Sequence, residues 1–317
     1  MLTRKEFLSG VLMASAAIPS LAKDTSPTKA LSRPSRSMPV LAYASFEVGA
    51  ERPFSVLHIS DTHLTAAYPS EDKRRVKASV TGTKLFGGEQ ENALRVSLAW
   101  AKKTTDYVLH TGDLIDFQTE ANLDLVRKYY GTDVKMIGAI GNHERYMEKT
   151  GEPPVNSPQY RAESDAALSQ AYPFDISFSS SVLHGVNFVT LANTDGTVTA
   201  EQVAKFEAEV KKGLPIILCA HVPFFTDGIY RASERYWRDR GKKFREAGVP
   251  APRGDRKRQL EDSVTRDFVA ALKSQPLLKG VLVGHLHVAV ADRFSPTAME
   301  YVSGANFNYA ALEAMFV

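Results

Sequence analysis

The chain has 317 residues, of which 44% are hydrophobic and 24% are charged. That hydrophobic share is sufficient for a packed core, which excludes wholesale disorder, and the length suits one large domain or two small ones. The formal net charge of +3 does not by itself indicate a nucleic-acid-binding protein, and the single cysteine, Cys219, excludes an intramolecular disulfide and a cysteine-rich zinc site.

The N-terminus has the features of a secretory signal. Residues 4–5 are basic, residues 7–18 are apolar but too short for a comfortable membrane span, and residues 20–22 (Ser-Leu-Ala) fit the pattern that signal peptidases cut. We predict a signal peptide over residues 1–22, export to the periplasm or the extracellular space, and no transmembrane span after cleavage. An uncleaved anchor is the alternative. Residues 3–8 resemble a twin-arginine signal in which lysine replaces the second arginine, so the export route stays open.

The next segment, residues 23–45, is rich in Ser, Pro and Thr and shows no apolar period, which predicts a flexible linker. We place the folded domain at residues 46–317, with its first strand near Phe54. Because the rest of the chain has no internal repeat and no further linker, we expect a single α/β domain there.

Strands and helices alternate in the predicted domain. Helical apolar spacing predicts helices over residues 91–103 and 199–210, the second capped by Thr199 with Gln202 three places on. A hairpin is predicted around His184-Gly185. Short apolar runs predict strands at residues 54–60, 107–110, 134–140, 176–178, 186–191, 216–220 and 281–283.

Short pieces bearing histidine or aspartate follow five of these apolar runs. They are Asp61-Thr62-His63, Gly112-Asp113, Gly141-Asn142-His143-Glu144, His221 and Gly284-His285-Leu286-His287. Strand ends of α/β sheets face a crevice, and residues two apart on an extended chain point the same way, so an Asp-x-His triplet can share one metal ion. A carboxylate with two oxygens can bridge two cations.

Most of these pieces alone have an ordinary explanation, although the histidine pair at residues 285 and 287 is harder to explain in that way. The aspartate and asparagine pieces alone are best read as turns or helix caps, and a lone histidine such as His221 is more often a satisfied core residue. For His58, His110 and His184 we prefer core or surface positions. The five pieces together, in this order and each at a strand end, are better explained as one metal site.

The ordered set resembles the calcineurin-like metallophosphoesterase superfamily, from Phe54 to about Ala310. The resemblance implies a four-layer α-β-β-α sandwich of two mixed sheets flanked by helices, within the α/β (α+β) class. It implies two metal ions of open identity, with Fe, Mn and Zn as the first choices. By position, one ion would be held by Asp61, His63 and His287, the other by Asn142, His221 and His285, with Asp113 bridging them.

The same resemblance implies an activity, the hydrolysis of phosphate esters. Two cations would lower the pKa of a shared water, and the resulting hydroxide would attack phosphorus in line with the leaving alcohol. His143 would face the substrate and assist departure of the alcohol, and Asp116 would orient His143. The choice between a phosphodiesterase and a phosphomonoesterase stays open, with a slight preference for the diesterase.

Other catalytic signatures are absent from the sequence. His143-Glu144 does not begin a zinc-protease motif, because Met147 stands where the second histidine is needed. Cys219 has Phe225 six places on, where a cysteine phosphatase needs arginine. Gly82 and Gly87 have P-loop spacing, but a glycine replaces the lysine.

A basic segment, residues 231–258, follows His221 and contains eleven Lys or Arg against four Asp or Glu. It could attract an anionic substrate or be a solvated surface insertion. Because aromatic residues are interleaved with the arginines, a nuclease or nucleic-acid-binding protein is a second hypothesis. A non-catalytic anion- or metal-binding protein of the same fold is a third, and the oligomeric state is open.

Overall fold

The computed structural model describes residues 35–155, 157–241 and 252–317. The predicted signal peptide and most of the predicted linker therefore lie outside the described residues. In the part of the chain that is described, no helix is both long and apolar enough to cross a membrane.

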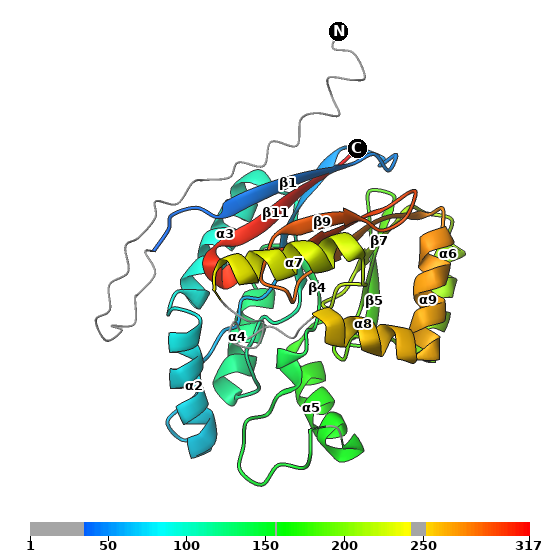
Figure 1. Cartoon of the computed structure of the whole chain (residues 1–317). Helices are drawn as coiled ribbons and strands as arrows, with labels where there is room; N and C mark the ends of the chain where they lie inside the picture. The colour runs from blue at the N-terminus through cyan, green and yellow to red at the C-terminus, as the bar shows by residue number, and fades with distance from the viewer. Residues whose placement is uncertain (1–34, 156, 242–251) are drawn as a thin grey trace. The chain divides into compact units, whose positions relative to one another are not determined.

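The described strands form two mixed sheets (Figure 1). The first sheet has the order β1 (Val40–Phe46), β11 (Ala310–Phe316), β2 (Phe54–Ile59), β3 (Tyr107–Thr111) and β4 (Met136–Ala139). The second has the order β5 (Phe178–Leu183), β6 (Val186–Leu191), β7 (Ile216–Cys219), β8 (Leu278–Val283), β10 (Met299–Val302) and β9 (Val290–Arg293). Strands β2, β3 and β4 run parallel, as do β6, β7 and β8.

Helices cover the outer face of each sheet. The described helices are α2 (Lys73–Leu85), α3 (Gln90–Thr104), α4 (Glu120–Tyr130), α5 (Pro158–Ala171), α6 (Ala200–Val210), α7 (Asp227–Asp239), α8 (Pro252–Glu261) and α9 (Ser263–Ser274), with short 3₁₀ turns at His143–Arg145 and Asn306–Asn308. Apolar residues of α3, α4 and α5 pack on the first sheet, and those of α6 and α9 pack on the second.

The two sheets pack on each other through a third apolar layer. Phe54 and Val56 of β2 enter this layer, whereas Leu57 and Ile59 pack toward the helices of the first sheet. Strand β2 is buried along its whole length because both of its faces are covered, and such strands have nearly continuous apolar sequences. The predicted four-layer α-β-β-α sandwich is confirmed.

Most predicted elements are present, with changed limits. The helix α6 begins after the predicted cap, where Thr199 and Gln202 form both hydrogen bonds of a capping box. The hairpin around His184 is present, but its first strand is β5 at Phe178–Leu183 rather than residues 176–178.

The prediction of a linker up to residue 45 is wrong at its C-terminal end. Residues 40–46 form β1, which pairs in parallel with β11 at the other end of the chain. Because β1 lies at the edge of the sheet, most of its residues are exposed or half-buried, and the strand has no regular apolar period. It is stabilised by pairing with a distant segment, which local composition does not reveal.

Candidate metal centre

The ends of five strands deliver the predicted site residues to one place. Asp61 and His63 follow β2, Asp113 and Asp116 follow β3, Asn142 and His143 follow β4, His221 follows β7, and His285 and His287 follow β8. The first three strands belong to one sheet and the last two to the other, so the site lies where the carboxyl ends of both sheets meet.

The backbone at five of these positions is left-handed rather than extended. Asp61, His63, Asp113, His285 and His287 have φ between 51° and 72°. The expectation that the Asp-x-His triplet is extended is therefore wrong, although both side chains still reach the same cluster. A left-handed non-glycine residue costs roughly 1–3 kcal/mol and persists only where the surroundings fix it, as is common at functional sites.

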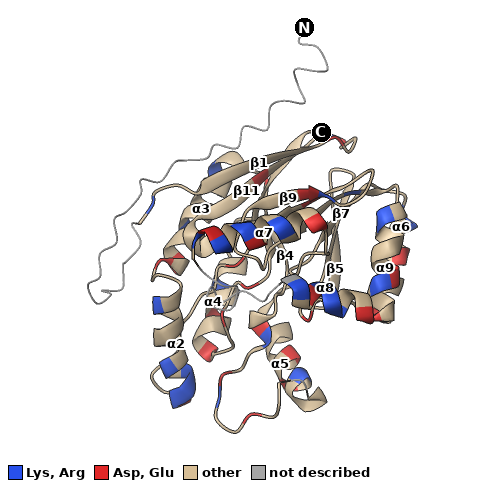
Figure 2. Ribbon diagram, in the orientation of Figure 1, with Lys and Arg blue, Asp and Glu red and all other residues tan. Residues whose placement is uncertain are grey.

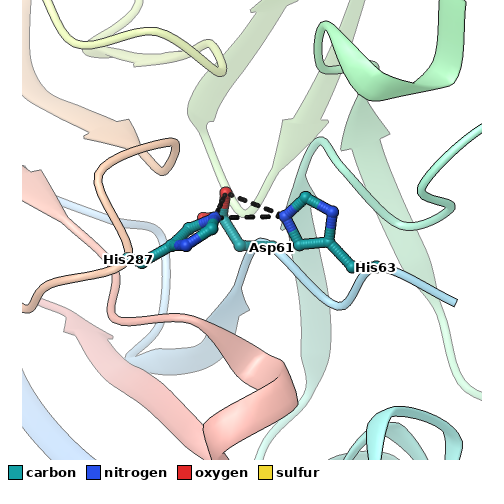
Figure 3. A group of neighbouring side chains, drawn as sticks. All are labelled: Asp61, His63 and His287. Carbon is teal, nitrogen blue, oxygen red and sulfur yellow. Dashed lines mark hydrogen bonds and ion pairs between the residues drawn. The ribbon is translucent and has the colours of Figure 1, made fainter. Parts of the chain in front are cut away.

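The first cluster is formed by Asp61, His63 and His287, all of them buried (Figure 3). The Nε2 atoms of the two histidines lie 3.1 Å apart. Asp61 Oδ1 lies 3.4 Å from His287 Nε2 and 4.0 Å from His63 Nε2. One carboxylate and two imidazoles converging in this way can hold a metal ion.

The second cluster is formed by Asp113, His221 and His285. His221 Nδ1 lies 2.8 Å from the carbonyl oxygen of Thr111 and donates to it, which leaves its Nε2 free to bind. That Nε2 lies 3.2 Å from Asp113 Oδ2 and 3.2 Å from His285 Nδ1.

Two observations indicate that this centre suits cations. The buried side-chain oxygen of Asn142, which lines the same cavity as His285 of the second cluster, has no hydrogen-bond partner in the described structure. Although burial opposes a charge on His221, the carboxylate of Asp113 raises the pKa of that histidine to about 9. The negative potential that favours a proton there would also favour a metal ion.

His143 lies beside the first cluster and is partly exposed. Its Nδ1 lies 2.7 Å from Asp116 Oδ1, and the same carboxylate oxygen lies 3.0 Å from His63 Nδ1. Burial opposes protonation, but Asp113 and Asp116 hold the pKa of His143 well above its usual value. Asp116 is thus placed to orient both His143 and a residue of the first cluster.

Glu144 has a structural role that its sequence context did not predict. This buried carboxylate accepts the backbone N–H groups of Gly141, Asp113 and Leu114 at 2.6–2.9 Å, so it joins the loops that follow β3 and β4. Burial, with help from Asp113, raises the pKa of Glu144 to about 7. Its place directly after Gly-Asn-His was the available signal.

Two glycines allow these loops to touch. Gly112 has φ of 95°, and a β-carbon on it would lie 2.5 Å from the backbone nitrogen of Gly141. A side chain at Gly112 would therefore push apart the segments that carry Asp113 and Asn142.

The remaining histidines have the ordinary positions that we preferred. His58 and His110 are fully buried, each bonded to a threonine hydroxyl, and burial lowers the pKa of each to about 3. His184 lies at the turn between β5 and β6, next to Arg52 and Tyr107.

A cavity of about 420 Å³ opens beside Asn142 and His285. Its wall includes Arg145, Tyr146, Tyr160, Arg161, Asp195 and Arg258. Each of the three arginines is paired with an aspartate, so the cavity is polar without a large excess of positive charge.

The basic segment is described only in part, because residues 242–251 lie outside the described residues. Its flanks are α7 and α8, along whose ribbons Figure 2 shows Lys and Arg positions mixed with acidic ones. Arg235 and Arg253 are strongly exposed and lie near Asp239 and Glu234, respectively.

Comparison with solved structures finds related folds at low identity. A dimetal phosphatase from Danio rerio has 13% identity over 82% of this chain and 91% of that one, with a TM-score of 0.46. A purple acid phosphatase from yellow lupin seeds has 13% identity over 82% of this chain and 45% of that one, with a TM-score of 0.43. Phosphopantetheinyl hydrolase from Mycobacterium tuberculosis has 12% identity over 80% and 91%, with a TM-score of 0.40. These similarities are too weak to bear on substrate or metal.

No curated protein sequence matches the chain. The family model of the calcineurin-like phosphoesterases matches residues 54–289, which span β2 to the end of the Gly-His-Leu-His loop and include every residue of the two clusters. The chain belongs to the calcineurin-like phosphoesterase family.

Proposed function

We propose that this chain is an exported hydrolase of phosphate esters that works with two metal ions. The observation that carries the proposal is the position of Asp113. One of its carboxylate oxygens, Oδ2, lies 3.5 Å from His63 Nε2 and 3.2 Å from His221 Nε2, so it faces both clusters at once.

The residues divide between two ions in the way the resemblance implies. Asp61, His63 and His287 would hold one, Asn142, His221 and His285 the other, and Asp113 would contact both. When bound, such a pair of ions lowers the pKa of a water and offsets the negative charge of the phosphoryl oxygens.

His143 supplies the proton for the leaving alcohol in this proposal. Its Nδ1 is engaged by the side chain of Asp116 at 2.7 Å and lies 3.1 Å from the backbone oxygen of the same residue. Both partners are acceptors, so Nδ1 carries a proton, and the opposite nitrogen remains for the substrate. General acid catalysis of this kind contributes typically about 10²–10⁴-fold.

The cavity beside Asn142 and His285 supports the preference for diesters. With about 420 Å³ it has room for an organic group next to the reacting phosphorus. A diester carries a second organic substituent besides the leaving group, and this cavity could hold it.

Hydrolysis of p-nitrophenyl phosphate and of bis-p-nitrophenyl phosphate tests the proposal, with metal content measured on the same samples. We expect about two metal ions per chain, faster turnover of the diester, and loss of activity in Asp113→Asn. His184→Gln, a histidine variant in the turn between β5 and β6 and outside both clusters, is the control that should keep activity. Wild-type protein without metal and without activity, even after adding manganese, zinc or iron, would refute the proposal in favour of a binding protein. Faster turnover of the monoester would refute only the diesterase preference.

Export is proposed from residues 1–22 and tested separately. Fractionation of producing cells should place the shortened chain outside the cytoplasm. A full-length chain that stays with the membrane would instead favour the uncleaved anchor.

A further inference from the structure

We propose that Asp255, on α8, is a positioning residue that fixes His285 in the tautomer and orientation needed to bind a metal ion. The inference rests on the proposed function, because it assigns a role within the second metal site. It also assigns a role at the metal centre to α8, which contains part of the basic segment.

Helix α8 buries polar residues, which a surface helix normally exposes. Asp255 and Gln259 are each only 4% exposed, whereas Leu260 is 52% exposed. Residues four apart lie on one face of a helix, so the buried face of α8 is polar. A surface helix normally buries an apolar stripe, so the burial of apolar residues does not explain why α8 lies here.

Gln259 fastens α8 to the loop that follows His221. Its side-chain oxygen accepts the backbone N–H of Phe225 at 3.0 Å, and its amide nitrogen donates to the carbonyl oxygen of Pro223 at 2.8 Å. The helix is thereby held against the chain segment that supplies one histidine of the second cluster.

Asp255, one turn earlier on the same face, points to the other histidine. Its Oδ2 lies 3.5 Å from His285 Nε2, and its Oδ1 is paired with the guanidinium of Arg258. A buried carboxylate is stable only with such partners. Arg258 holds one oxygen, which leaves the second oxygen directed at the imidazole.

The two nitrogens of His285 therefore face different surroundings. Nδ1 lies 3.2 Å from His221 Nε2, inside the cluster, whereas the buried Nε2 has no hydrogen-bond partner in the described structure and faces Asp255. A neighbouring carboxylate favours the tautomer with the proton on Nε2, which leaves the lone pair of Nδ1 for a metal ion. Carboxylates behind metal-binding histidines act in this way, and their loss typically lowers metal affinity about 10–100-fold.

The test compares Asp255→Asn with Asp195→Asn in metal titrations of the full chain. Asp195 is a matched control because it also lines the cavity and is paired with an arginine, Arg161. After removal of metal with a chelator, each variant is titrated with Zn²⁺, and the bound ions are counted. We expect two sites in the wild type and in Asp195→Asn. In Asp255→Asn one site should be unchanged and the other weakened about 10–100-fold. Asp255→Glu should recover part of the affinity.

A second measurement needs no variant of Asp255. The ¹⁵N spectrum of the imidazoles in metal-free wild-type protein reports which nitrogen carries the proton, and His285→Gln identifies the signals. A proton on Nε2 supports the inference. Two unchanged sites in Asp255→Asn, or a proton on Nδ1, would overturn it while leaving the proposed function intact. A wild type that binds fewer than two ions would overturn both.

Discussion

The side chains of the centre are held by backbone geometry that is unfavourable on its own. Asp113 has a left-handed backbone, and its N–H donates to Glu144 at 2.9 Å while its Oδ1 accepts the N–H of His143 at 3.0 Å. His285 is held likewise, because its N–H donates to both oxygens of Asp61. These bonds oppose the strain and leave the ligand-type atoms little freedom, which lowers the entropic cost of binding an ion.

His143 offers the most direct test of the chemistry at residue scale. His143→Gln removes the proton donor but none of the proposed metal ligands, so metal content should stay unchanged while kcat falls by about 10²–10⁴. The fall should be larger for a phenyl ester than for a nitrophenyl ester, because a poorer leaving group depends more on a proton. Equal falls for both esters would contradict a role as general acid. His184→Gln should leave both rates unchanged.

The buried Glu300 should make the stability of the fold depend on pH. It is fully buried on β10, and burial holds the pKa of its carboxyl well above the usual 4.5. Above about pH 4.5, Glu300 of the unfolded chain has lost a proton that the folded chain retains. This residue therefore destabilises the fold increasingly as pH rises toward the raised pKa.

Glu300→Gln removes this titration and retains an oxygen to accept the N–H of Phe224, which Glu300 accepts at 2.8 Å. We expect the variant to gain stability relative to wild type between about pH 5 and pH 8, by roughly 1.4 kcal/mol for each pH unit over which only the folded chain keeps Glu300 protonated. Thermal unfolding at both pH values measures the change. A constant difference between the two proteins would show that Glu300 does not titrate in this range.

At the scale of elements, the contribution of β1 to the stability of the domain can be tested. Phe46, at its end, is 5% exposed, stacks on Phe316 with ring centroids 4.8 Å apart, and packs between the sheets. Phe46→Ala should lower the free energy of unfolding by about 3–5 kcal/mol. Tyr43 lies on the same strand but is 70% exposed, so Tyr43→Ala should stay within about 0.5 kcal/mol of wild type. Denaturant unfolding measures the stability of both variants. Equal stabilities would mean that residues 40–46 behave as part of the linker.

The contrast between β1 and the other elements shows what the sequence could reveal. Strands β2 and β8 have mostly apolar sequences because both of their faces are covered, and Thr199 with Gln202 indicates the cap of α6. Such signals are local. The pairing of β1 with β11 is not, because it joins segments about as far apart as the chain allows.

The same distinction holds for the site. The residues of the two clusters could be predicted because each follows a recognisable strand. Asp255 could not be predicted as part of the site, because it lies in a charged helix in which most residues are exposed. Only the folded chain brings it next to His285. The left-handed backbone at the strand ends was missed for a similar reason, as it depends on bonds such as those of Glu144 to distant N–H groups.

For the whole molecule, the centre joins the two halves of the sandwich. Asp61, His63 and Asp113 come from the first sheet, and His221, His285 and His287 come from the second. The first cluster takes His287 from the second sheet, and the second takes Asp113 from the first. Each proposed ion would therefore be held by both sheets, so binding should stabilise the packing of one sheet on the other as well as the loops.

Metal binding should consequently raise the thermal stability of the whole domain. An ion that binds only the folded chain stabilises it by about 2.7 kcal/mol when its concentration is 100 times Kd. We expect the melting temperature of chelator-treated protein to rise with added Zn²⁺ or Mn²⁺ in a single transition. Asp113→Asn should show a much smaller rise, because the residue shared by both clusters has lost its charge. A rise confined to a separate minor transition would mean that the ions stabilise only local loops, and the sheets would then be held together by their apolar layer alone.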